Sequence, residues 1–167
     1  PLSLDEAYLD VTGCDSAIAT AKTIKQRIQE TTQLTASAGV SINKFLAKMA
    51  SDVNKPDGLY VILPEDAMAF IATLPIEKFH GIGPATARKM KQLGIVTGAD
   101  LQRWSETDLV ANFGKVGRHY FRVANAQDNR QVNPNRIRKS VGAERSFAED
   151  LQSLEAMTKA LAAIVDE

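Results

Sequence analysis

Two neighbouring carboxylates near the amino end, Asp5 and Glu6, are the residues of this sequence best suited to chemistry. The segment around them is mostly apolar, and an uncompensated charge beside a hydrophobic core is costly. Mg²⁺ prefers oxygen ligands and commonly takes one or two protein carboxylates, completed by substrate phosphates and water. In two-metal phosphoryl transfer, such carboxylates hold ions that activate the attacking hydroxyl and neutralise the leaving group. The pair is a candidate magnesium site, although taken alone it fits ordinary solvated acids on a surface strand better.

Lys55 lies in a turn directly after a predicted helix, within the sequence Lys-Pro-Asp-Gly at 55–58. A lysine ammonium on a flexible stem can reach a phosphate as a point charge. Taken by itself, the residue fits a solvated turn lysine better. Lys55 becomes a candidate phosphate ligand only when it is considered together with Asp5 and Glu6.

A glycine hairpin at Gly81, Ile82 and Gly83, followed at once by a helix pattern, is the stronger local signal. Two glycines around one apolar residue let backbone N–H groups point outward, and the next helix presents its positive end. Such a device binds phosphate without reading a base. The pattern is similar to the helix-hairpin-helix motif, and Arg88 and Lys89 on its helix add positive charge.

A second, looser hairpin follows, and its members are Gly114, Lys115, Val116 and Gly117. One such hairpin could be a mere connection between helices. Two of them within a basic stretch favour sequence-independent binding of a nucleic-acid duplex.

Charge is unevenly distributed, although the whole chain has a formal net charge of +0. Residues 1–73 hold six basic and nine acidic side chains, residues 74–145 hold thirteen and six, and residues 146–167 hold one and five. The middle block, at net +7, is a candidate phosphate-facing surface. Many helical domains carry a similar excess for solubility alone, so charge by itself does not decide the partner.

Several classes of protein are excluded by composition. The single Cys14 cannot form an internal disulfide framework or a cysteine-only zinc site, and His80 and His119 are too few for a metal centre. No stretch has the length of a membrane span or the pattern of a secretory signal. These observations predict a soluble, cytoplasmic protein.

Hydrophobic periodicity predicts the elements that must position these residues. Strand, helix, strand, helix, strand and helix are expected in turn over residues 4–12, 16–32, 35–40, 43–53, 59–63 and 64–74. Asp15 is expected to cap the first helix and Pro64 to begin the third. In the second helix, Phe45, Leu46 and Met49 are expected to face inward. Short helices punctuated by glycine then follow. After a linker come a strand at 137–147 and a last helix, whose apolar pattern consists of Leu154, Met157, Leu161 and Ile164. Because a strand pattern opens the chain and a helix pattern closes it, both ends look cut.

Three separated segments resemble Y-family translesion DNA polymerases of the DinB type, in particular the bacterial members. They are SLDEAYLDV at 3–11, ASAGVSINKFLAKMASDVNKPDG at 36–58 and RKSVGAERSF at 138–147, in the family's order and with the hairpin between them. The resemblance implies an α+β fold built from a partial palm, an all-helical helix-hairpin-helix thumb, and the first strand and helix of the little finger. The implied ranges are 1–74 for the palm, 75–128 for the thumb, 129–136 for a linker and 137–167 for the truncated little finger.

The resemblance also implies roles for single residues. Asp5 and Glu6 match the paired palm carboxylates that hold the catalytic Mg²⁺ ions, and Lys55 matches the lysine that contacts the incoming triphosphate. The two hairpins match loops that grip a DNA backbone. A further match to the strand along the template phosphates comprises Arg138, Lys139 and Ser140.

Family members join a nucleotide from a dNTP to a primer 3′-hydroxyl on template DNA and tolerate damaged templates. This chain departs from them because the first metal carboxylate, the fingers and most of the little finger are missing. A sliding clamp is the expected partner of the parent protein, but its binding peptide is absent here. The chain alone is therefore expected to be inactive, since positioning and metal charge supply most of phosphoryl-transfer catalysis.

An alternative reading is a non-catalytic, sequence-independent DNA-binding module that uses the two hairpins. A glycosylase or ligase is less favoured, because neither SLDEAYLDV nor NKPDG has a place there.

Overall fold

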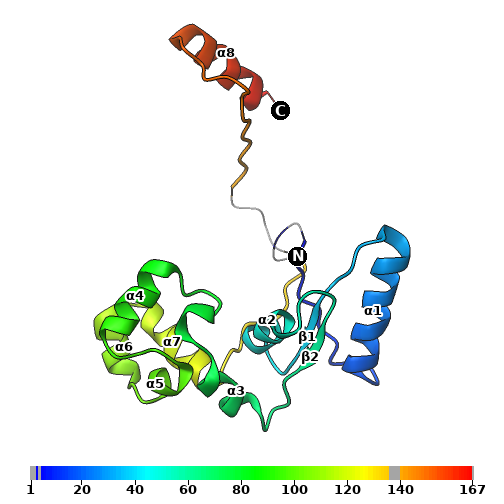
Figure 1. The fold of residues 1–167 in the computed structure, drawn as a ribbon, viewed down its shortest axis with the longest axis vertical. Helices are drawn as coiled ribbons and strands as arrows, with labels where there is room; N and C mark the ends of the chain where they lie inside the picture. The colour runs from blue at the N-terminus through cyan, green and yellow to red at the C-terminus, as the bar shows by residue number, and fades with distance from the viewer. Residues whose placement is uncertain (1–2, 4, 136–139, 167) are drawn as a thin grey trace. The chain divides into compact units, whose positions relative to one another are not determined.

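The computed structural model describes residues 3, 5–135 and 140–166 (Figure 1). The chain divides into two compact units, Pro1–Val132 and Asn133–Glu167. Among the described residues, no helix has both the length and the apolar character needed to cross a membrane.

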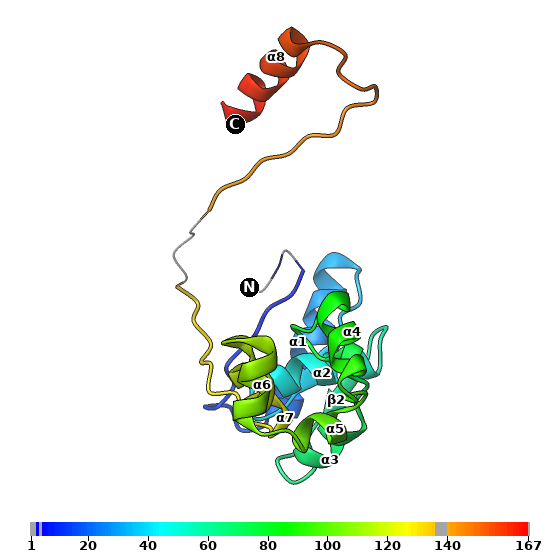
Figure 2. The same cartoon turned by 90° about the vertical axis from the view of Figure 1, so that its left-hand side faces the viewer.

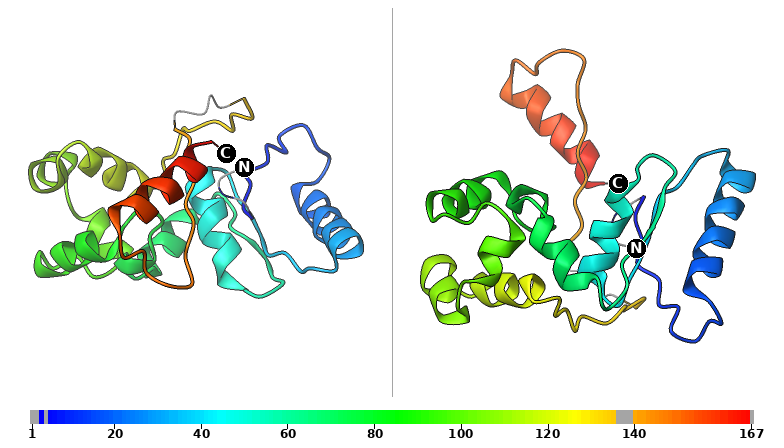
Figure 3. Two further views of the ribbon diagram at one scale, coloured as in Figure 1. Left: turned by 90° about the horizontal axis from the view of Figure 1, so that it is seen from above. Right: turned by 60° about the horizontal axis from the view of Figure 1, so that its bottom comes forward.

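A small parallel sheet forms one part of the first unit. Strands β1 (Ala38–Val40) and β2 (Leu59–Val61) pair in parallel, with Gly39 opposite Tyr60. Parallel neighbours require a crossover connection, and helix α2 (Lys44–Val53) supplies it. Within the first unit, both views in Figure 3 show α2 and the strands between helix α1 (Ala17–Thr32) and the green and yellow helices.

Local sequence explains where the helices of this part begin. The Ser16 hydroxyl accepts a hydrogen bond from the Ala19 amide at the start of α1, so the predicted cap at Asp15 was wrong by one residue. Helix α3 (Ala67–Thr73) begins three residues after Pro64, which was predicted to start it. Residues 64–66 form a turn instead, since the Asp66 amide donates to the Leu63 carbonyl at 3.1 Å.

Short helices make up the other part of the first unit. They are η1 (Ile76–Lys78), α4 (Pro84–Gln92), α5 (Gly98–Gln102), α6 (Glu106–Phe113) and α7 (Val116–Ala124). In Figure 2 these helices face the viewer and α1 lies behind them. Side chains cap the starts of two of these helices: Thr97 and Asp100 form a capping box on α5, and the Ser105 hydroxyl accepts from the Asp108 amide on α6.

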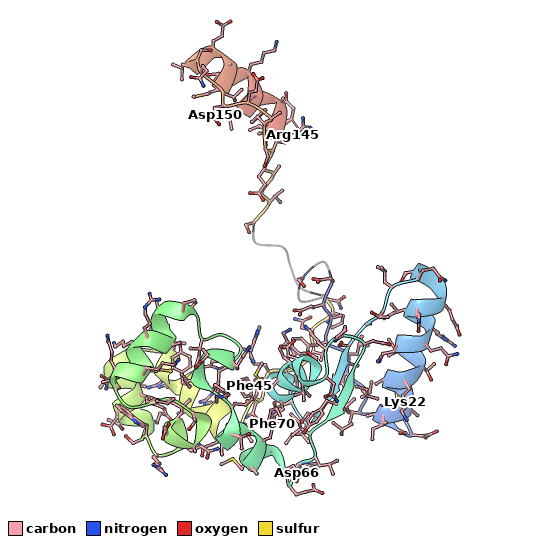
Figure 4. All side chains as sticks on the ribbon, in the orientation of Figure 1. Lys22, Phe45, Asp66, Phe70, Arg145 and Asp150 are labelled. Atoms are coloured by element: carbon pink, nitrogen blue, oxygen red, sulfur yellow. The ribbon has the colours of Figure 1, made fainter. Side chains whose placement is uncertain are left out.

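One hydrophobic core joins the sheet part to the helical part. Phe45, Leu46 and Met49 of α2 are buried, as the sequence predicted. The ring of Phe45 lies 5.5 Å from that of Phe79, which follows η1, and Figure 4 shows Phe45 on the side of α2 toward the helical elements. The core is therefore continuous across residue 74, and the domain boundary predicted there stays a prediction.

Two predicted strands are absent from the described residues. Residues 5–12 and 140–147 run without strand pairing, so the expectation of strands at 4–12 and 137–147 was wrong for these parts. A strand is stabilised by hydrogen bonds to a neighbouring strand, and in the described chain β1 and β2 pair only with each other. The last predicted helix is confirmed as α8 (Leu154–Val165) in the second unit, with the Ser153 hydroxyl accepting from the Ala156 amide.

The segment after α7 returns to the amino end of α2. There the Asn43 side chain accepts from the Leu46 amide and donates to the Ala126 carbonyl at 2.9 Å. Asp128, whose side chain is only 3% exposed, accepts from the Phe45 amide at 3.1 Å. Arg130 makes two bonds of 2.7 Å to the same carboxylate.

The pKa of Asp128 lies below its usual value for a definite reason. Burial acts to raise it, but the hydrogen bonds and charge of Arg130, with the bond from the Phe45 amide, together outweigh burial and lower it. A carboxyl with a lowered folded pKa stabilises the fold above its unfolded pKa of about 3.9. That stabilisation is lost as the pH falls through the folded pKa.

We expect Asp128→Asn to lower the free energy of unfolding by about 1.5–3 kcal/mol at pH 7, the range for hydrogen bonds to a charged group. The difference from the unchanged chain should begin to shrink below about pH 4, where the unfolded chain takes up the proton, and should continue to shrink as the pH falls toward the lower pKa of folded Asp128. Urea unfolding followed by circular dichroism from pH 3 to pH 7 measures it. Asp66→Asn, on an exposed aspartate with no cap hydrogen bond, is the matched control. A loss of the same size at every pH would contradict this account.

Candidate functional site

The two residues predicted to hold metal, Asp5 and Glu6, are neighbours in sequence near the amino end of the described chain. Asp5 is exposed and Glu6 is half-buried. The Ser3 hydroxyl donates to Asp5 Oδ1 at 2.8 Å. This bond and the backbone amide of Asp5 lower the pKa of its carboxyl, and the charges of Lys55 and Lys48 act in the same direction. Asp5 is therefore held in its charged form within the field of both lysines.

A line of alternating charges connects Glu6 to Lys55. Glu6 Oε1 lies 2.5 Å from Lys48 Nζ, Lys48 lies 3.6 Å from Asp52, and Asp52 lies 2.6 Å from Lys55. Lys48 and Asp52 stand one helical turn apart on α2, with Lys55 in the turn that follows. We name Glu6, Lys48, Asp52 and Lys55 the charge line, and it brings the predicted metal and nucleotide residues into one site.

Lys48 and Asp52 are functional-site residues that sequence reasoning missed. Burial acts to lower the pKa of Lys48, whose side chain is 14% exposed, but the hydrogen bond that Lys48 donates to Glu6 and the charge of Asp52 outweigh burial and raise it. Burial likewise acts to raise the pKa of Asp52, but the two lysines lower it. The i, i+4 spacing of Lys48 and Asp52 was the available signal.

Asp5 and Glu6 are the type of ligand that magnesium prefers, but two carboxylates are a minimal set of ligands. Asp5 and Glu6 offer the oxygen ligands that Mg²⁺ prefers, and one or two protein carboxylates are commonly enough for it. In the part of the chain that the structure describes, no group of three or more His, Cys, Asp or Glu side chains could hold a metal ion. Lys48 also compensates the charge of Glu6, which removes part of the sequence-based reason for expecting a metal there.

The first hairpin has one residue facing inward and two glycines facing open space. Ile82 is 7% exposed and belongs to the core, and its amide donates to the Phe79 carbonyl at 3.0 Å. Gly81 has φ +92°, which L side chains rarely adopt. Gly83, directly before Pro84, has an ordinary φ of −78°, and a Cβ there would meet nothing within 4 Å. Among the described residues, neither the φ of Gly83 nor a neighbouring atom requires glycine there, so a bare backbone is exposed at the start of α4.

The basic residues of α4 differ in their surroundings. Arg88 is exposed, whereas Lys89 donates to the Asn112 carbonyl of α6 and lies 5.0 Å above the ring of Phe113. Lys89 therefore connects the helix of the first hairpin to the helix that precedes the second.

The second predicted hairpin is the turn between α6 and α7. Gly114 has φ +67° and faces open space, while Lys115 and Val116 are exposed. Gly117 is buried, and a Cβ there would stand 2.2 Å from the Leu109 carbonyl oxygen. The close packing of α6 on α7 thus explains Gly117, while Gly114 and Lys115 remain on the surface.

The third predicted group of DNA-binding residues is only partly visible. Arg138 and Lys139 lie outside the described residues, and Ser140 is exposed in the second unit. The structure therefore does not place Arg138, Lys139 and Ser140 relative to the two hairpins.

Two family models match the chain. The impB/mucB/samB family matches residues 1–52, and the HHH motif of the IMS family matches residues 64–95. The first match contains Asp5, Glu6 and Lys48, and the second contains the first hairpin. Residues 1–52 and 64–95 are therefore similar to this family, and the chain shares the fold of the Y-family DNA polymerases.

Within that family, the chain is similar to bacterial DNA polymerase IV. It is 53% identical over 171 residues to DNA polymerase IV of Alkalilimnicola ehrlichii, covering 100% of this chain and 48% of the relative. It is 58% identical over 159 residues to DNA polymerase IV 3 of Mesorhizobium japonicum, covering 93% of this chain and 44% of the relative. A solved Y-family DNA polymerase chimera matches with a TM-score of 0.86 and 32% identity, over 98% of this chain and 49% of its own. The chain spans about half the length of the curated relatives it matches.

The two glycines of the first hairpin should respond differently to substitution. Gly81→Ala forces a side chain into the left-handed region, and we expect a stability loss of about 1–2 kcal/mol. Gly83→Ala meets open space at an ordinary φ, and we expect a loss below about 1 kcal/mol. Thermal unfolding of the two variants measures the difference. Equal losses would show that the hairpin differs from the geometry described.

Proposed function

We propose that this chain forms two parts of a template-directed translesion DNA polymerase. One part is one side of the nucleotide site, and the other is the pair of glycine hairpins that hold the DNA duplex, which we name the duplex grip. The reaction is transfer of a nucleotide from a dNTP to the 3′-hydroxyl of a primer. The observation that carries the proposal is the charge line, which joins the candidate metal ligand Glu6 to the candidate triphosphate ligand Lys55. Its setting supports it, because the relatives named DNA polymerase IV match the chain along nearly all its length.

In this proposal, Asp5 and Glu6 would hold Mg²⁺. When bound, the metal supplies charge neutralisation at the triphosphate and activation of the attacking hydroxyl. Ser3 and Lys48 orient the two carboxylates through the bonds described above. The ammonium of Lys55 offers a point charge to the triphosphate, and Asp52 keeps it beside the carboxylates in the absence of nucleotide.

The hairpins would grip the DNA backbone. Pro84 has no backbone N–H, so the amides that follow it in the first turn of α4 would donate to a phosphate, and the bare backbone at Gly83 would permit its close approach. The exposed Arg88 and Lys115 add long-range attraction within the basic block.

Ser140, with Arg138 and Lys139, would follow the template strand, and a sliding clamp would bind the longer protein elsewhere. Since the relatives are bacterial and their template lies in the cytoplasm, we place the enzyme there.

A second function fits the chain on its own. The basic block and the two surface glycine turns favour a duplex-binding module without catalysis. The two functions are compatible, because the first describes a protein of the relatives' length and the second describes this portion.

Removal of either carboxylate tests the catalytic proposal. In a full-length polymerase containing this chain, we expect Asp5→Ala and Glu6→Ala each to reduce primer extension by at least about 10³-fold, as for residues that act as one catalytic unit. Asp10→Ala is the control, since Asp10 is exposed in the same segment and bonds only Thr12 in the described contacts. Primer extension with Mg²⁺ measures the effect. Near-normal rates from either carboxylate variant would remove these residues from the site.

Salt dependence tests the duplex grip in this chain itself. We expect sequence-indifferent duplex binding whose logarithmic affinity falls linearly with the logarithm of salt concentration, by about 0.9 for each phosphate contact. Arg88→Ala should reduce that slope by about one contact, whereas Gln92→Ala on the same helix should leave it unchanged. Fluorescence anisotropy at several salt concentrations measures the slope. An affinity that does not change with salt would rule the grip out.

A further inference from the structure

The turn that carries Lys55 is fastened to helix α1 by a single side chain. Lys25 Nζ donates to the carbonyl oxygens of Asp57 at 2.5 Å and of Gly58 at 3.2 Å. The same atom lies 3.0 Å from the Asp57 carboxylate. An ammonium has three N–H donors, so these three acceptors engage its full capacity. Lys25 is 16% exposed, which is low for a lysine on a surface helix.

The backbone of this turn needs outside support. Asp57 has φ +53°, in the left-handed region that residues other than glycine rarely occupy. Such a conformation persists only when the surroundings hold it. Gly58 packs against the end of α2 so closely that a Cβ would stand 2.0 Å from the Asn54 carbonyl oxygen. The turn therefore has little freedom to find another path.

Further bonds hold the other side of the turn. The Ala38 amide at the start of β1 donates to the Gly58 carbonyl at 2.9 Å, and the Ser37 hydroxyl accepts from the Gly58 amide at 3.2 Å. Lys25 supplies the matching attachment from α1. Because α1 has no fully buried residue, this polar contact is a main link between α1 and the turn.

We propose that Lys25 is a positioning residue for the nucleotide triphosphate, acting through the turn that carries Lys55. The inference rests on the proposed function of Lys55. Half of the Lys55 side chain is exposed, at 51%, and ordering such a chain on a phosphate is entropically unfavourable. A turn whose backbone is already fixed lowers that cost, so Lys25 strengthens the contact without touching the substrate.

Direct binding of a ligand by Lys25 is the competing explanation. A shallow groove beside it is lined by Lys22, Lys25, Gln26, Gln29, Asp57 and Leu59. None of the predicted site residues lines this groove, and the three donors of Lys25 already point at the turn. The contacts therefore favour a role in holding the protein backbone.

Steady-state primer extension by the full-length polymerase tests the proposal. We expect Lys25→Ala to raise the KM for dNTP about tenfold, the size of coupling found between groups that share contacts, with a smaller change in kcat. Lys25→Arg should restore most of the affinity, because a guanidinium can also donate to the two carbonyl groups. Lys22→Ala is the matched control: Lys22 is exposed on α1, where Figure 4 labels it, and it should have no effect.

A double-mutant cycle separates this inference from the function on which it rests. If Lys25 acts through Lys55, the variant carrying Lys25→Ala and Lys55→Ala should have the same KM as Lys55→Ala alone. A KM unchanged by Lys55→Ala would overturn the proposed role of Lys55. A raised KM for Lys55→Ala with independent, multiplying effects of the two changes would overturn the role of Lys25. A lower melting temperature for Lys25→Ala with an unchanged KM would also overturn it, since that result describes a structural residue only.

Discussion

The amino end of α2 is the point on which the first unit depends. The first turn of a helix has backbone N–H groups without partners in the helix, and here Asn43 and Asp128 satisfy two of them. Each of these residues also links α2 to a segment 83 residues away along the chain. The same helix buries Phe45 against the helical part and carries Lys48 and Asp52 toward Lys55. Support of the fold and support of the site are therefore properties of one ten-residue helix.

In the candidate site, as in α2, single residues make more than one contact. Glu6 comes from a segment without regular structure, and Lys48 fixes its carboxylate from the neighbouring helix. Asp52 serves both lysines, so that none of the four charges in the charge line stands alone. An exposed ion pair contributes little stability on its own, but a network of several charges holds its geometry better. In the proposed function, this arrangement offers groups of opposite sign to a nucleotide and its metal ions.

Much of the fold followed from local patterns in the sequence. The periodicity of α2 predicted the burial of Phe45, Leu46 and Met49, and the helix patterns located α1 and α8 to within a few residues. The strands predicted at 4–12 and 137–147 failed where they are described, because a strand depends on a partner that local sequence does not reveal. The pairing of Glu6 with Lys48 spans 42 residues and was invisible for the same reason. The glycines show a further limit, since Gly83 and Gly117 look alike in sequence but one meets solvent and the other a carbonyl oxygen.

Lys89 gives the two glycine turns a shared mechanical property. Its ammonium joins α4 to the last turn of α6, so a displacement of one turn is passed to the other. Two turns joined in this way are expected to move together. In the proposed function, a phosphate bound at one turn would therefore influence the position of the other through a contact inside the protein.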